Sequence, residues 1–140
     1  MRKLLACAAG LVAMLSVGTT QAEAAKLDGH IKGEPDATLT ILVKNFKGDR
    51  YVTRVNFKDI PVRCESGRST TSGSGPAGRD GEFGLPVKER EFSGRWHYGR
   101  IDGKFKGSGK VTGELSLTIE VDAAHGECKS GKLEYVVREG

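Results

Sequence analysis

The residues best suited to acid–base or metal chemistry are three scattered histidines. His30, His97 and His125 do not lie at i, i+2 or i+4 from one another, so no metal site has sequence support. Solvated or capping roles are the ordinary interpretation of such histidines. There is also no G-x-S-x-G motif that would expose a nucleophilic serine. The sequence therefore predicts no catalytic residue, no metal and no cofactor.

The segment Trp96-His97-Tyr98 is the most aromatic part of the chain. An exposed Trp and Tyr could stack on sugar rings, because the CH face of a pyranose is apolar and the aromatic face is electron-rich. However, Trp96 has the same parity as Phe92, which predicts that it faces a core. Core packing is the favoured interpretation, and a binding platform is the alternative.

Basic side chains recur at alternating positions of two segments. They are Arg50, Arg54 and Lys58 in the first segment, and Lys104 and Lys106 in the second. If these segments are neighbouring strands, they form a positive stripe suited to teichoic acids, lipopolysaccharide cores or sulfated glycans. Acidic residues such as Asp102 and Glu114 interrupt the stripe. An ordinary salt-bridged outer sheet is therefore the favoured interpretation.

Short β-strands would have to position these side chains. No segment after the N-terminal region has helical spacing of apolar residues, whereas alternation with period two recurs. The alternating segments are residues 38–43, 50–57, 111–122 and 133–138. Glycine-rich turn signals separate them. This pattern predicts an all-β fold, an antiparallel β-sandwich or flattened barrel of eight or nine strands.

Two glycine-containing features modify this prediction. In three segments a glycine shares the parity of its apolar neighbours, and these glycines are Gly94, Gly103 and Gly113. A glycine weakens a strand unless curvature or close packing requires it, so we interpret them as fold devices with aromatic rings lying over the gap. The Ser/Gly-rich segment at about 65–84 predicts either a long flexible loop or a polar edge hairpin with a flexible tip.

The N-terminus predicts export. Arg2 and Lys3 precede an apolar run at residues 4–17, and Ala22-Glu23-Ala24 matches a cleavage motif, so residues 1–25 read as a signal peptide cleaved after Ala24 or Ala25. The run is too short to be a permanent membrane anchor. An uncleaved anchor and lipidation of Cys7 are the alternatives, although Cys7 lies at the start of the run and not at its end. Residues 26–140 then form one domain, secreted to the periplasm or the outside of the cell.

Two cysteines, Cys64 and Cys128, remain after cleavage. In an oxidising compartment such a pair is most simply a disulfide, and closing a loop of about 65 residues stabilises by roughly 4 kcal/mol. A metal site or a nucleophilic thiol is the alternative, but no C-x-x-C partner supports it.

Removing residues 1–25 takes away two basic residues and one acidic residue, which lowers the net charge from +4 to +3. This mild charge permits anionic partners without requiring them, and no nucleic acid partner is expected.

Three stretches resemble a known group of proteins. They are Ile101-Asp102-Gly103-Lys104-Phe105, Lys110-Val111-Thr112-Gly113-Glu114-Leu115 and Cys128-Lys129-Ser130-Gly131. The chain is similar to uncharacterised small exported bacterial β domains that combine such a hairpin with a C-x-x-G ending. The resemblance implies a compact β-sandwich with a disulfide between a central strand and the penultimate segment. It implies no activity.

Three functions are compatible with these observations. The first is a non-catalytic binding or envelope-associated module whose partner is an anionic cell-surface polymer, a glycan or another protein. The second is a small extracellular hydrolase that uses His97 or His125 beside a carboxylate. The third is a secreted inhibitor or protein-interaction domain that presents the segment 65–84.

Overall fold

The computed structural model describes residues 24–107, 109–122 and 126–140. The features predicted for residues 1–23, including the apolar run and lipidation at Cys7, lie outside this part of the chain, as does His125. Within it every regular element is a β-strand and all strand pairs are antiparallel, which confirms the predicted all-β fold. The strands are β1 (Ala24–Ile31), β2 (Glu34–Phe46), β3 (Asp49–Cys64), β4 (Gly67–Pro76), β5 (Leu85–Pro86), β6 (Glu91–Trp96), β7 (Gly99–Lys106), β8 (Lys110–Asp122), β9 (Gly126–Lys129) and β10 (Leu133–Glu139).

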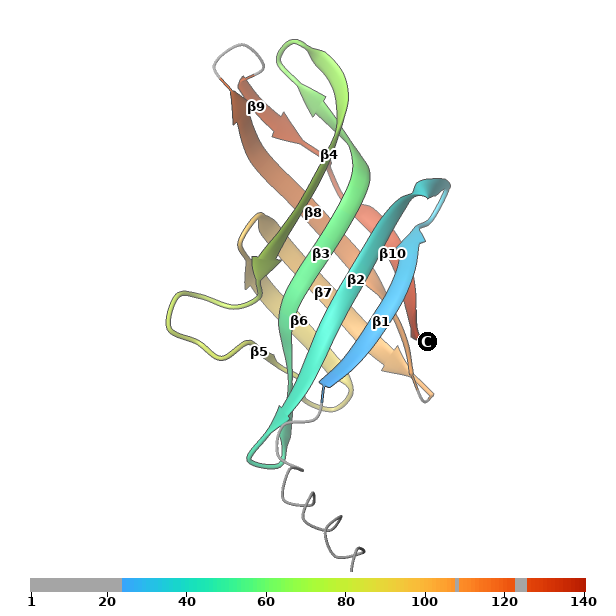
Figure 1. Ribbon diagram of the computed structural model, residues 1–140, viewed down its shortest axis with the longest axis vertical. Coiled ribbons are helices and arrows are strands. Elements are labelled where there is room, and N and C mark those ends of the chain that lie inside the picture. The colour runs from blue at the N-terminus through green and yellow to red at the C-terminus, as the bar shows by residue number, and fades with distance from the viewer. Residues whose placement is uncertain (1–23, 108, 123–125) are drawn as a thin grey trace, which may run out of the picture.

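Six of these strands close a barrel in the order β10-β1-β2-β3-β9-β8, with β10 returning to β8 (Figure 1). The other four lie outside this ring: β4 and β5 pair with β3, and β7 continues from β8 to β6. Just after β4 the chain also pairs with β6, because the Gly78 amide donates to the Arg95 carbonyl at 2.8 Å. The described chain has ten strands and not eight or nine, since the two-residue β5 and the four-residue β9 are too short to leave an alternating pattern.

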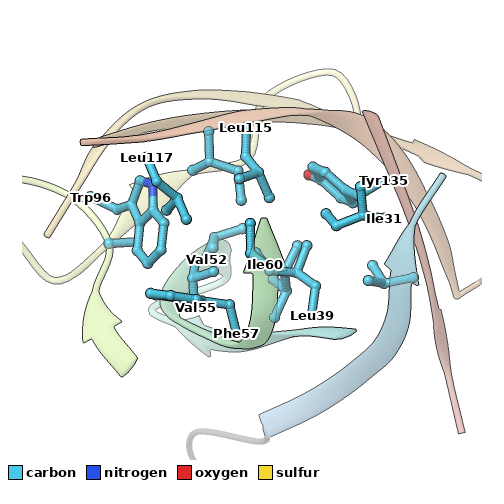
Figure 2. Close-up of a cluster of buried hydrophobic side chains, with 14 of the residues drawn as sticks. Ile31, Leu39, Val52, Val55, Phe57, Ile60, Trp96, Leu115, Leu117 and Tyr135 are labelled. Atoms are coloured by element: carbon cyan, nitrogen blue, oxygen red, sulfur yellow. The ribbon is translucent and has the colours of Figure 1, made fainter. Parts of the chain in front are cut away.

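Apolar side chains from every part of the ring fill the barrel interior (Figure 2). They include Ile31, Leu39, Val52, Val55, Phe57, Ile60, Leu115, Leu117 and Tyr135, all of which are buried. Burial of this surface is the main driving force for folding. In the described part of the chain no helix is long and apolar enough to cross a membrane.

Strand β3 departs from the regular alternation that the sequence suggests. Its register with β2 shifts at Leu42/Val43, so Val52 and Val55 are both buried although they have opposite parity. Its register with β4 shifts again between Phe57 and Ile60. Each shift is a β-bulge, which inserts an extra residue and reverses which side chains face inward. The expectation that alternate positions from residue 50 to residue 58 share one outer face is therefore wrong.

The glycines of β7 and β8 lie where two strands approach closely, which confirms their interpretation as fold devices. Gly103 is the cross-strand partner of Gly113. A Cβ atom at Gly113 would collide with the Asp102 carbonyl oxygen. The rings of Phe92 and Tyr135 lie over Gly103, and the Tyr135 hydroxyl donates to the Asp102 carbonyl at 2.6 Å.

The Ser/Gly-rich segment takes the hairpin form of its two predicted alternatives. Residues 67–76 form strand β4, so the prediction of a flexible loop over all of 65–84 is wrong for this part. Polar residues can form this strand because the backbone of β3 supplies the pairing, and because Gly73 and Gly75 leave room for the rings of Tyr98 and His97. The connection at residues 77–84 follows it.

The Cys64–Cys128 disulfide is present and joins β3 to β9, where the two cysteines are cross-strand partners. It lies at the end of the barrel that also contains the β1–β2 and β3–β4 turns, which we call the disulfide end (Figure 1). A bridge of this kind favours an oxidising, non-cytoplasmic compartment.

Candidate functional site

The aromatic segment of the β6–β7 hairpin belongs mostly to the core. Trp96 is only 4% exposed, and its ring lies at right angles to Phe57 with the centroids 5.5 Å apart. Tyr98 is half-buried and contacts the same two rings, whereas His97 is exposed. A sugar ring therefore cannot reach the Trp96 indole in this structure, and core packing accounts for its position.

The histidines that the structure describes, His30 and His97, are both exposed. His97 and Asp80 line one open hollow between β6 and the connection after β4. No hydrogen bond joins these two side chains among the described contacts, and the described residues contain no group of three or more His, Cys, Asp or Glu placed to hold a metal ion. This hollow brings a histidine and a carboxylate to the same part of the surface.

The predicted basic residues do not form one stripe, because β3 and β7 are not paired with each other. Arg54 donates to the Ser74 hydroxyl at 2.8 Å, and Lys104 lies 3.6 Å from Glu91 in an exposed ion pair. Lys58 pairs in register with Thr38, towards the disulfide end. Arg50 and Lys106 lie at the opposite end of the barrel, and Lys104 lies next to that end as the cross-strand partner of Glu91.

At that opposite end lies a cluster that sequence reasoning missed. Phe46 and Phe83 are the two exposed large apolar side chains of the described chain, at 43% and 44% exposure. Their rings stack with centroids 4.9 Å apart, and Tyr51 meets Phe83 edge-on at 5.1 Å. The Lys47 ammonium lies 5.3 Å from the centre of the Phe46 ring. We call Phe46, Tyr51 and Phe83 the aromatic tip.

Local backbone structure positions both halves of the aromatic tip. The β2–β3 hairpin turns at Lys47 and Gly48, whose φ angles of 53° and 86° match a two-residue hairpin turn and place Phe46 at its base. Phe83 comes from the connection at 77–84, which is held to β3 because the Ala77 amide donates to the Thr53 carbonyl at 3.1 Å. Within that connection the Glu82 carboxylate accepts a hydrogen bond from the Arg79 amide at 2.7 Å.

Basic residues outnumber acidic ones at the end of the barrel that carries the aromatic tip. The β2–β3 turn, the start of β6 and the β7–β8 turn meet at this end, since the Val87 amide bonds to the Arg50 carbonyl and the Phe105 amide to the Arg90 carbonyl. The segments that form it, including the connection that carries Phe83, have nine Lys or Arg against six Asp or Glu; they are residues 44–50, 77–91, 106–110 and 138–140. We call this the basic end.

The disulfide end has the opposite balance. Its segments carry six basic and seven acidic residues; they are residues 31–36, 58–68, 118–120 and 126–134. The barrel is therefore electrically polarised along its axis, and its exposed aromatic rings lie within the positive end.

Comparisons of the chain with family models, with curated proteins and with solved structures gave no match in any of the three. The site must therefore be interpreted from its own chemistry.

Proposed function

We propose that this protein is an exported, non-catalytic binding module of the cell envelope that holds an anionic partner at its basic end. The observation that carries the proposal is the partly exposed Phe46–Phe83 stack, with the Lys47 ammonium over the Phe46 ring, at the end of the barrel where basic residues are in excess. Two large apolar side chains that stay partly exposed beside basic residues are typical of a contact site. The β2–β3 hairpin and β3 hold the two rings at a fixed position, which lowers the entropic cost of binding.

The disulfide supports the compartment in this proposal. It forms in an oxidising environment, and the N-terminal pattern of two basic residues, an apolar run and an A-x-A motif is typical of secretion. We accordingly propose the periplasm or the cell exterior as the site of action.

Retention of the exported form on immobilised heparin, a sulfated polymer, tests the proposal. We expect retention at low salt and release as salt screens the contact. Lys44→Glu combined with Lys47→Glu should elute at clearly lower salt. Lys58→Glu combined with Lys132→Glu makes the same change in net charge near the disulfide end and should elute much closer to the wild type. Equal shifts for the two pairs would contradict a localised site.

A second candidate, a protein-interaction domain, has its own supporting observation. In the part of the chain that the structure describes, residues 67–74 of β4 pair only with β3, so the other backbone edge of this strand is free. Such an edge can accept a strand from another protein. Ser72→Pro should abolish strand addition while leaving heparin retention unchanged, and capture of a partner by both proteins alike would argue against this edge.

A further inference from the structure

We infer that the aromatic tip docks on the surface of an anionic phospholipid bilayer, with Phe46 and Phe83 entering the headgroup region. This inference rests on the proposed function and names the partner of the same site. It depends on the shape of the tip, on the charge around it and on the course of the chain.

The tip is a protrusion. Figure 1 shows the β2–β3 hairpin projecting beyond the start of β1 and beyond β5. Phe46 lies at the end of this hairpin, and Phe83 stacks on it from the neighbouring connection. Apolar side chains on a convex tip can enter a soft interface, where aromatic rings are favoured at the level of the lipid headgroups. A folded partner would need a matching cavity to cover the same two rings.

The charge around the tip fits a negatively charged bilayer. Lys44, Lys47 and Arg50 lie within four residues of Phe46 and are exposed, so they outnumber the exposed acids nearby, which are Asp49 and Glu82. Basic residues beside inserted aromatic rings gain energy from anionic headgroups. Because the disulfide end has slightly more acidic than basic residues, the field of the membrane would also orient the barrel with its basic end toward the lipid.

On the proposed export route, the course of the chain would bring the same end close to the membrane. Ala24 is the cross-strand partner of Lys44, so the polypeptide that precedes it joins the barrel next to the tip. The apolar run at residues 4–17 ends shortly before this point. A precursor whose leader is still held in the bilayer therefore has its basic end nearest to the lipid.

A soluble anionic polymer explains these observations less completely. It would bind the lysines and arginines, but it gives no reason for two phenylalanine rings to remain exposed among them. The apolar pair is the feature that favours lipid over a sulfated or phosphorylated polysaccharide.

Co-sedimentation of the exported form with lipid vesicles tests the inference. We expect binding to vesicles of one part phosphatidylglycerol to two parts phosphatidylcholine, and little binding to pure phosphatidylcholine. Phe46→Ser combined with Phe83→Ser should weaken binding roughly tenfold or more, because two apolar side chains no longer enter the interface. Lys44→Glu combined with Lys47→Glu should weaken it strongly, whereas Lys58→Glu combined with Lys132→Glu should have a much smaller effect.

A second measurement separates insertion from electrostatic adsorption. Trp96 is the sole tryptophan and is buried, so its fluorescence is a constant background. Phe83→Trp adds a reporter at the tip. On anionic vesicles we expect its emission to shift to the blue and lipids brominated on their acyl chains to quench it.

The outcomes distinguish this inference from the proposed function. Retention on heparin without binding to anionic vesicles would overturn the lipid assignment and keep the anionic partner. Vesicle binding that is unchanged in the Phe46→Ser, Phe83→Ser protein would also overturn it, as would fluorescence of the Phe83→Trp protein that brominated lipid does not quench. Binding to neither heparin nor vesicles would contradict both.

Discussion

The two ends of this barrel are built differently. At the disulfide end, Cys64 and Cys128 are buried and covalently joined, and charges of the two signs are nearly balanced. At the basic end, Phe46 and Phe83 are left partly in water, and basic residues outnumber acidic ones. The disulfide end contributes to stability. The basic end keeps apolar surface that remains exposed after folding. Changes at the two ends should therefore have separable effects on unfolding and on binding.

The largest expected effect on stability comes from removing the disulfide. Cys64→Ala combined with Cys128→Ala opens a loop with a sequence separation of 64 residues. In the chain-entropy model this lowers the free energy of unfolding by roughly 4 kcal/mol. Urea unfolding of this variant, beside reduced wild-type protein, measures the loss. Protein that is still folded should keep its heparin retention, and a loss of retention in folded protein would show that the ends are coupled.

Tyr135, between the two ends, should give a smaller effect that depends on pH. Burial raises the pKa of Tyr135 above its ordinary value near 10, and the Asp102 carboxylate adds to this shift. The unfolded chain then ionises before the folded one, so the stability that this tyrosine contributes is complete below pH 10 and is lost as the pH rises above about 10.

Tyr135→Phe checks this prediction. The variant removes the hydrogen bond to the Asp102 carbonyl and should be less stable by about 1 kcal/mol at neutral pH. Its unfolding free energy should also decline less steeply between neutral and alkaline pH than that of the wild type. Parallel pH profiles for the two proteins would contradict the assigned shift.

Arg50 tests how much the basic end contributes to stability. Its guanidinium lies 4.4 Å from the centre of the buried Phe105 ring. Removal of this cation–π contact by Arg50→Ala should lower stability by about 0.5–1 kcal/mol, because the arginine is exposed. Arg50→Lys is the matched control that retains the charge. A loss of several kcal/mol in urea unfolding would mean that this end is a structural element.

For each residue changed, the aromatic tip should have the smallest effect on stability. Phe46→Ser combined with Phe83→Ser removes a stack that lies outside the barrel interior and is partly exposed, so the unfolding free energy should change by only about 1 kcal/mol. Binding to anionic vesicles should weaken roughly tenfold or more in the same protein. Thermal unfolding and co-sedimentation on one preparation make the comparison, and a strong destabilisation would identify the rings as part of the core.

The sequence predicts strand β8 well and strand β3 poorly, and the difference is physical. In β8, Val111, Leu115 and Leu117 are buried as the alternation requires, since its pairing with β7 is regular throughout. In β3, two bulges reverse the parity, and a bulge depends on how the partner strands fit together. Local sequence does not contain this information, so the prediction of the outer face of β3 was wrong.

The features that no sequence pattern predicted, strand β4 and the Phe46–Phe83 stack, depend on tertiary contacts. Residues 66–76 contain no apolar side chain to bury, and β4 exists because β3 offers its backbone. Phe46 and Phe83 are 37 residues apart, and neither lies in a motif that predicts their stacking. Period-two alternation and the even pair of cysteines, in contrast, were sufficient to predict an all-β chain with a Cys64–Cys128 bridge.

The closure of the barrel has a consequence for the timing of biogenesis. Strand β1 pairs with β10, so the ring cannot be completed until the ribosome has made residues 133–139. Until then β1 has an open edge, and pairings between distant segments form slowly. A chain that threads through a membrane in sequence order would thus remain unfolded through most of its passage and complete its structure only after the last strand has crossed.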